Sequence, residues 1–166
     1  MTKSIVDFKE ILLLEEPLSR HTWLRLGGPA QYFLSPRTEH ELLSVIQTCR
    51  QQELPIYILG AGSNLLVREE GVRGAVIRVV ETLLSDVQVD GTSVTAGGGA
   101  LLSNVISEVV RAGLGGVEHL VGIPGTIAGA VVGNSGGRAG DIGQLVTSVE
   151  VLTQDGERAV RTGDEL

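Results

Sequence analysis

Two glycine-rich segments carry the residue types that could bind a ligand. The first reads GAGSNLLV, from Gly60 to Val67, and the second reads GIPGTIAGAVVGN, from Gly122 to Asn134. Glycine permits positive φ angles and close approach to the backbone, and successive N–H groups in such turns form positive concavities that suit phosphate. Both segments are therefore candidate sites for a ligand with two phosphates and an apolar ring, such as a dinucleotide.

The first segment directly follows the predicted strand IYILG. A Rossmann fingerprint would need a third glycine where Leu65 stands, and a Walker loop would need Gly-Lys-Ser/Thr, so both nucleotide-binding motifs are excluded. What remains is a tight turn in which Ser63 and Asn64 can present a hydroxyl and an amide to a ligand. A simple β-turn, for which these residue types are common, is the alternative.

The second segment predicts a turn followed by a short helix. Pro124 fixes one φ angle, Gly125 is free to take a positive one, and Thr126 is a good N-cap. Gly129 and Gly133 would leave one helix face bare, open to a flat ligand or to another backbone, and the N–H groups of the first turn could hold a phosphate. Tight packing of this helix on a sheet is equally compatible with the pattern.

Strands and helices alternate along the rest of the chain, which predicts an α+β protein. Thr38 and the apolar spacing after it predict a helix that ends near Leu54, before Pro55. Two strands, IYILG and AVIRV, follow, and then a hairpin at Asp90-Gly91 with Val87, Val89, Val94 and Ala96 facing inward. A further helix carries Leu102, Val105, Ile106 and Val109 on one face and stops at Gly113. A second hairpin is predicted at Asp155-Gly156.

We expect two lobes, residues 1–82 and residues 83–166. The first is predicted to be a small βαββ unit, and the boundary is placed near residues 80–86, where a basic strand gives way to ETLLSD and the first hairpin. A chain of 166 residues is long enough for one domain or two small ones.

The charge and cysteine content restrict the partners and the compartment. A formal net charge of −7 argues against nucleic acid or an anionic membrane, since either needs a clustered cationic surface. Cys49 is the only cysteine, and the N-terminal segment lacks the features of a signal peptide, so we expect a cytoplasmic protein. The expected partners are small molecules, the expected state is a monomer, and the three scattered histidines do not predict a metal site.

Four ordered motifs resemble one enzyme family. They are HTWLRLGGPAQYF from His21, ILGAGSNLLV from Ile58, GLGGVEHLVGIPGTIAGAVVGNSGG from Gly113, and SVEVL from Ser148. In this order they resemble the UDP-N-acetylenolpyruvoylglucosamine reductases, flavoenzymes of peptidoglycan synthesis, over most of the chain from Pro17 to Leu152.

This resemblance implies a fold, a cofactor and a set of site residues. The fold is an FAD-binding domain of the vanillyl-alcohol-oxidase type, in which two α+β lobes hold the flavin and a C-terminal substrate domain follows. The first motif, with Arg25, would lie close to the cofactor. The residues expected to cradle the pyrophosphate are Gly60, Ala61, Gly62, Ser63 and Asn64, with Leu65 beside them, and those expected on the other side of the flavin are Gly122, Pro124, Gly125, Thr126, Gly129 and Ala130.

The resemblance also implies a reaction, in which NADPH reduces FAD and the flavin N5 delivers hydride to an enolpyruvyl UDP-sugar. The family's Tyr-Arg-x-Ser arginine, its serine proton donor and its glutamate follow the last hairpin, and this sequence stops at TGDEL before them. We therefore assign no catalytic residue. Arg138 and Ala139 also stand where the family often has a ring. A stand-alone flavin-binding or nucleotide-binding module without turnover is the alternative function.

Four further expectations concern single residues. Cys49 is expected to lie in the core, and Trp23 is expected either to fill the core or, as the alternative, to stack on a ligand. Ser63 is expected to act as a turn or loop hydroxyl rather than as a proton donor. Replacing Gly62 with valine is expected to block the phosphate site while leaving the fold largely intact.

Overall fold

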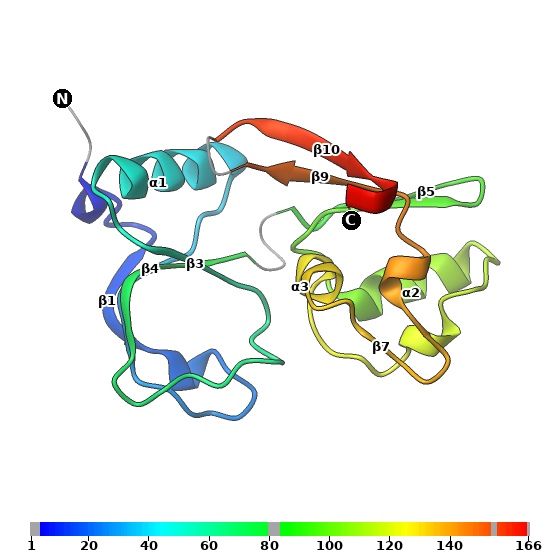
Figure 1. Ribbon diagram of the computed structural model, residues 1–166, viewed down its shortest axis with the longest axis horizontal. Coiled ribbons are helices and arrows are strands. Elements are labelled where there is room, and N and C mark those ends of the chain that lie inside the picture. Colours follow the sequence, from blue (N-terminus) through cyan, green and yellow to red (C-terminus); the bar gives the residue numbers. More distant parts are fainter. Residues whose placement is uncertain (1–3, 80–83, 154–155, 166) are drawn as a thin grey trace.

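The computed structural model describes residues 4–79, 84–153 and 156–165, and it arranges them as two groups of elements side by side (Figure 1). The first group consists of β1 (Leu12–Pro17), β2 (Pro29–Leu34), α1 (Glu39–Gln51), β3 (Ile56–Leu59) and β4 (Val72–Arg78). The second consists of β5 (Val87–Asp90), β6 (Ser93–Ala96), α2 (Leu102–Arg111), α3 (Ile127–Val132), β7 (Gly136–Gly137) and β8 (Gly140–Asp141). This mixture confirms the predicted α+β class.

The first group is built on a four-stranded sheet in the order β1-β2-β4-β3. β4 is parallel to both neighbours, β2 and β3, and its run from Gly74 to Ile77 is fully buried, as expected for a central parallel strand. The edge strand β1 makes this unit ββαββ rather than the predicted βαββ. The sequence did not reveal β1 because Leu13 and Leu14 are about half exposed and no polar alternation marks the strand.

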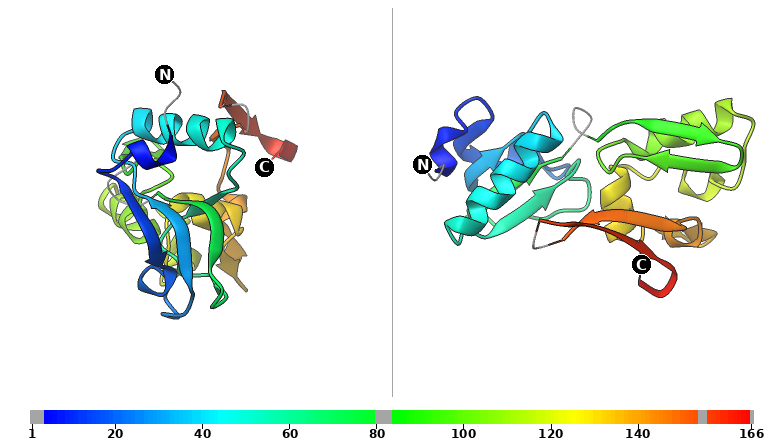
Figure 2. Two further views of the ribbon diagram at one scale, coloured as in Figure 1. Left: turned by 90° about the vertical axis from the view of Figure 1, so that its left-hand side faces the viewer. Right: turned by 90° about the horizontal axis from the view of Figure 1, so that it is seen from above.

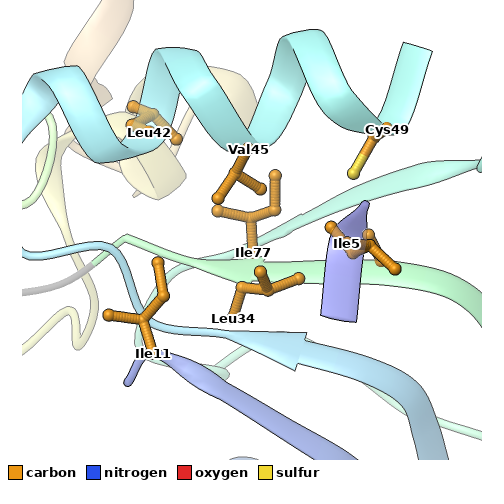
Figure 3. Close-up of a cluster of buried hydrophobic side chains, with 8 residues drawn as sticks. Ile5, Ile11, Leu34, Leu42, Val45, Cys49 and Ile77 are labelled. Carbon is orange, nitrogen blue, oxygen red and sulfur yellow. The ribbon is translucent and has the colours of Figure 1, made fainter. Parts of the chain in front are cut away.

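One face of the sheet is covered by α1 (Figure 2). The buried side chains between them form one cluster, shown in Figure 3: Ile5, Ile11, Leu34, Leu42, Val45, Cys49, Ala75 and Ile77. Cys49 is fully buried there, as predicted, and burial raises the pKa of its thiol to about 11.

The opposite face is covered by loops and a short 3-10 helix (Leu18–Arg20) rather than by an α-helix. Phe33, Leu59 and Val76 are buried there together with Leu18 from the segment after β1. The loops that follow β1 and β3 are tied by backbone hydrogen bonds, since Gly28 N–H donates to the Arg68 carbonyl at 2.9 Å. Val67, the last residue of the first glycine segment, packs against this buried cluster, so the segment reaches the face of the sheet away from α1.

Within the described residues, the three α-helices end in the same backbone motif. α1 ends at Gln51, not near Leu54, because Glu53 takes a left-handed conformation with φ +53° and the N–H of Leu54 donates back to the Cys49 carbonyl at 2.8 Å. Gly113 plays the same part after α2, with φ +71°, which confirms the predicted stop. Asn134, with φ +41°, follows α3.

The second group has its own buried side chains. Leu102, Leu120, Ala130 and Ile142 form one cluster, and a second cluster joins α2 to the β5–β6 hairpin. The hairpin is antiparallel and turns after Asp90 as predicted. Val89 pairs with Val94 and so lies on the same face as Val87, Val94 and Ala96, as predicted, but near the turn it is 36% exposed and lies outside their cluster.

The last strands, β9 (Ser148–Leu152) and β10 (Arg158–Thr162), form an antiparallel hairpin that reaches toward α1 (Figure 1). Arg158 bonds both Glu150 of the hairpin and Glu39 at the start of α1, so the hairpin is attached to the first group. Asp155 of the predicted turn and residues 80–83 of the proposed lobe boundary lie outside the described residues. Within the described ranges, no helix is long and apolar enough to cross a membrane.

Candidate cofactor-binding site

The structure brings the two glycine segments into direct contact. The Ser63 hydroxyl donates a hydrogen bond to the Pro124 carbonyl at 3.1 Å. A Cβ added at Gly125 would lie 3.2 Å from the Ser63 Oγ, and one added at Gly60 would lie 2.8 Å from the Thr126 Oγ1. The segments, far apart in sequence, thus form one continuous surface, and Ser63 has the loop role expected of it.

The conformation of Gly62 is constrained by neighbouring backbone of the protein. It has φ +67°, and a Cβ at this position would lie 2.0 Å from the carbonyl oxygen of His21. The Gly62 carbonyl in turn accepts a hydrogen bond from the Trp23 N–H at 3.0 Å. The expectation that valine at position 62 leaves the fold intact is therefore wrong, because its side chain would collide with backbone that cannot move away alone.

The backbone N–H groups of the first segment are candidate donors to a ligand. Within the described part of the chain, none of the N–H groups of residues 61–64 donates a hydrogen bond to another residue. No helix follows the turn, and Asn64 and Leu65 are exposed. Successive unpaired N–H groups in a glycine turn have the geometry of an anion nest.

The second segment uses its N–H groups differently. At the start of α3, the Ile127 N–H donates to the Ala100 carbonyl and the Ala128 N–H to the Gly98 carbonyl, both at 2.9 Å. The Gly129 N–H donates to the hydroxyl of Thr126, the predicted N-cap, at 3.3 Å. The expectation that these N–H groups hold a phosphate is wrong, since the protein already accepts their hydrogen bonds.

The remaining predicted site residues lie on the exposed face of α3, on its buried side, or in the turn before it. Gly129 and Gly133 are exposed, beside Val132 at 90% exposure, so the helix presents the bare face that the glycine spacing predicts. Ala130 and Thr126 are buried, and Ala130 packs against Leu102 and its neighbours. Gly122 and Gly125 have φ +86° and +133°, and Pro124 between them is exposed. Contacts of these residues with a flavin stay predictions.

A cavity of about 410 Å³ adjoins the first segment. Its lining residues are Arg20, His21, Thr22, Trp23, Arg25, Ala61 and Arg78. The sequence motifs drew attention to Ala61 and Arg25, but Arg20 and Arg78 were missed. A signal for Arg78 was present, because it directly follows the buried run from Gly74 to Ile77, and a charged side chain in such a position is seldom buried without a partner.

The turn at residues 21–26 forms one wall of this cavity. The buried hydroxyl of Thr22 donates to the Leu26 carbonyl at 2.9 Å, and Arg25 takes a left-handed conformation with φ +53°. The His21 ring stacks on Phe33 with centroids 4.3 Å apart and bonds Glu16 at 3.0 Å. Trp23 is 68% exposed, so the expectation that it fills the core is wrong.

Comparison with known families decides what kind of domain this is. A model of the FAD-binding domain family matches residues 30–161, which include both glycine segments. The chain belongs to the FAD-binding domain family. Its unpaired N–H groups at residues 61–64 fit this assignment, because a nest of donors suits the diphosphate of FAD.

Individual proteins similar to this FAD-binding domain include UDP-N-acetylenolpyruvoylglucosamine reductases. The chain is 41% identical over 157 residues to the UDP-N-acetylenolpyruvoylglucosamine reductase of Clostridium botulinum strain Hall, an alignment that covers 92% of this chain and 51% of that protein. The crystal structure of the enzyme of that class from Thermus caldophilus has 38% identity and a TM-score of 0.72, over 91% of this chain and 53% of that one. The chain thus spans about half the length of these relatives.

A more distant structure supports the fold alone. A VAO-type flavoprotein from Myceliophthora thermophila matches with a TM-score of 0.64 at 17% identity, over 81% of this chain and 27% of that one. Together with the family match, this similarity confirms the predicted vanillyl-alcohol-oxidase type of FAD-binding fold.

Proposed function

We propose that this chain forms the FAD-binding part of a UDP-N-acetylenolpyruvoylglucosamine reductase. The observation that carries the proposal is the contact between the two glycine segments, which the Ser63–Pro124 hydrogen bond joins. At this contact, the N–H groups of residues 61–64 have no acceptor in the described chain. The 41% identity to a protein of that name across 92% of this chain supports the specific activity.

The proposed roles of the residues follow from their positions. Residues 60–65 bind the diphosphate, while Gly122, Pro124, Gly125 and the exposed face of α3 at Gly129 lie along the flavin. Thr126 and Ala130 support that face from the buried side. The proposed lobes, residues 1–82 and 83–166, hold the cofactor between them. When bound, FAD supplies the hydride transfer from NADPH to the enolpyruvyl double bond of the UDP-sugar.

No described residue is assigned as the proton donor of this reaction. What this chain would contribute is binding and orientation: the nest would hold the diphosphate, and the Ser63–Pro124 contact would keep the two segments together beside the cofactor. Reduction of the enolpyruvyl group would give UDP-N-acetylmuramate, so the proposed partners of the complete protein are NADPH and the UDP-sugar.

The first test is binding of FAD to the purified chain. We expect the protein to retain flavin through gel filtration, to show a protein-bound flavin spectrum, and to quench or shift flavin fluorescence with a single dissociation constant. A colourless protein that leaves added FAD unchanged would contradict the proposal.

The second test separates a reductase from a binding module. The complete gene product is expected to oxidise NADPH in the presence of UDP-N-acetylglucosamine enolpyruvate and to release UDP-N-acetylmuramate, detected by mass spectrometry. Flavin binding by that product without turnover of the UDP-sugar would favour a carrier module instead.

A further inference from the structure

The arginine-lined cavity beside Ala61 carries an excess of positive charge in a protein whose formal net charge is −7. Of its three arginines, Arg20 pairs with Glu16 at 3.5 Å, and Glu16 also bonds His21. Among the described residues, Arg25 and Arg78 form no ion pair. Two guanidinium groups are therefore uncompensated at this site.

Arg78 is the more informative of the two. Its Nε atom is buried and has no hydrogen-bond partner in the described part of the chain. Buried donors without an acceptor are uncommon in folded proteins, and a bound ligand can supply the acceptor that the protein lacks. Arg78 lies opposite Leu59 in the β3–β4 ladder and shares a sheet face with Val76, the face that carries the first glycine segment.

The other walls of the cavity narrow the chemistry of the ligand. Ala61 belongs to the run of residues whose N–H groups are unpaired, so backbone donors and guanidinium groups adjoin each other. The exposed indole of Trp23 offers a flat apolar surface beside them. Oxyanions next to a planar ring are the features of a nucleotide, and arginine is well suited to phosphate because its donors can bind two oxygens at once.

We propose that this cavity binds the diphosphate of a nucleotide, with Arg78 and Arg25 as its charged ligands. The inference rests on the proposed function, because the FAD, NADPH and UDP-sugar that it names all contain this group. It goes beyond that function by assigning cationic side chains, rather than backbone alone, to the diphosphate.

The test compares matched arginine variants. Arg78→Met and Arg25→Met each remove one cavity guanidinium, while Arg73→Met removes an exposed arginine from the same strand, β4, outside the cavity. Titrations with FAD, UDP and NADPH are run separately on each protein at low and high salt. The nucleotide that occupies the cavity is expected to lose about 10- to 100-fold in affinity in both cavity variants and to keep its affinity in Arg73→Met.

Two further readouts separate binding from a structural role. The salt dependence of that nucleotide's affinity should weaken in the cavity variants, and Arg78→Lys should restore part of it because the charge returns. Inorganic pyrophosphate should compete with the nucleotide in the unaltered protein. If Arg78→Met does not fold, Arg25→Met alone decides the result, since Arg25 is exposed.

The outcomes distinguish this inference from the proposed function. If the wild type binds FAD, and if both cavity variants keep the same affinity for FAD, UDP and NADPH as Arg73→Met, the cavity assignment is overturned. The proposed function would then still stand. Absence of FAD binding in the wild type would overturn the proposed function, whereas a change confined to UDP or NADPH would still place that nucleotide's diphosphate in the cavity.

Discussion

The two glycine segments have similar composition, but they differ in whether their backbone N–H groups have hydrogen-bond acceptors within the protein. In the first, the N–H groups of residues 61–64 have no acceptor within the described chain. In the second, the N–H groups of Ile127 and Ala128 are bonded to the carbonyls of Ala100 and Gly98. The same residue types thus leave their N–H groups without protein acceptors in one place and bond them to the fold in the other, and the difference depends on what lies opposite each segment.

Substitution of Gly62 tests the difference between the two segments with the largest expected effect. Gly62→Val places a branched side chain at φ +67° and against the His21 carbonyl. We expect a loss of stability of about 3 kcal/mol or more, a fall in Tm of roughly 10 °C, and FAD affinity reduced more than about 100-fold. Circular dichroism and flavin titration measure these effects.

Gly137→Ala is the control for that substitution, since a Cβ at Gly137 meets no atom within 4 Å. It should leave both Tm and FAD affinity nearly unchanged. Equal behaviour of the two variants would mean that the first segment does not have the close backbone contact described.

The two helix N-caps provide a finer comparison. Thr126→Val and Thr38→Val each remove a hydroxyl that accepts a backbone hydrogen bond, from Gly129 and from Glu41. Each should cost about 1 kcal/mol of stability. Only Thr126→Val should also weaken FAD binding, by about threefold to tenfold, because Thr126 lies against Gly60. Loss of FAD affinity in Thr38→Val to the same extent would show that the effect is general destabilisation.

The hydrogen bond between the segments should give the smallest effect. Ser63→Ala removes the donor to the Pro124 carbonyl, and we expect about 0.5–1.5 kcal/mol of lost stability and a reduction of FAD affinity within about tenfold. Ser107→Ala, which removes a hydroxyl bonded to the Ser103 carbonyl within α2, is the matched control. FAD affinity should distinguish the two, and an unchanged affinity in Ser63→Ala would show that the two segments bind FAD without their mutual bond.

Local features of this fold could be predicted from the sequence, because they depend on neighbouring residues. The N-caps at Thr38 and Thr126, the stop at Gly113 and the turn after Asp90 are all encoded within a few positions. The destination of each N–H group could not be predicted, since Gly98 and Ala100 reach α3 only through the tertiary fold. The position of Arg78 after a buried run was visible in the sequence, but the cavity it lines was not, because that cavity is assembled from the loops after β1 and β3.

The burial of Cys49 has a practical consequence. It is the only cysteine of the chain, and it is fully buried on the face of α1 that packs against the sheet. Burial raises the pKa of its thiol to about 11, so the native protein should present almost no reactive thiolate at neutral pH. A cysteine introduced at an exposed position such as Arg138 would then be the single site of maleimide attachment. Fluorescent or spin labels could therefore be placed on either group of elements without first removing the native thiol.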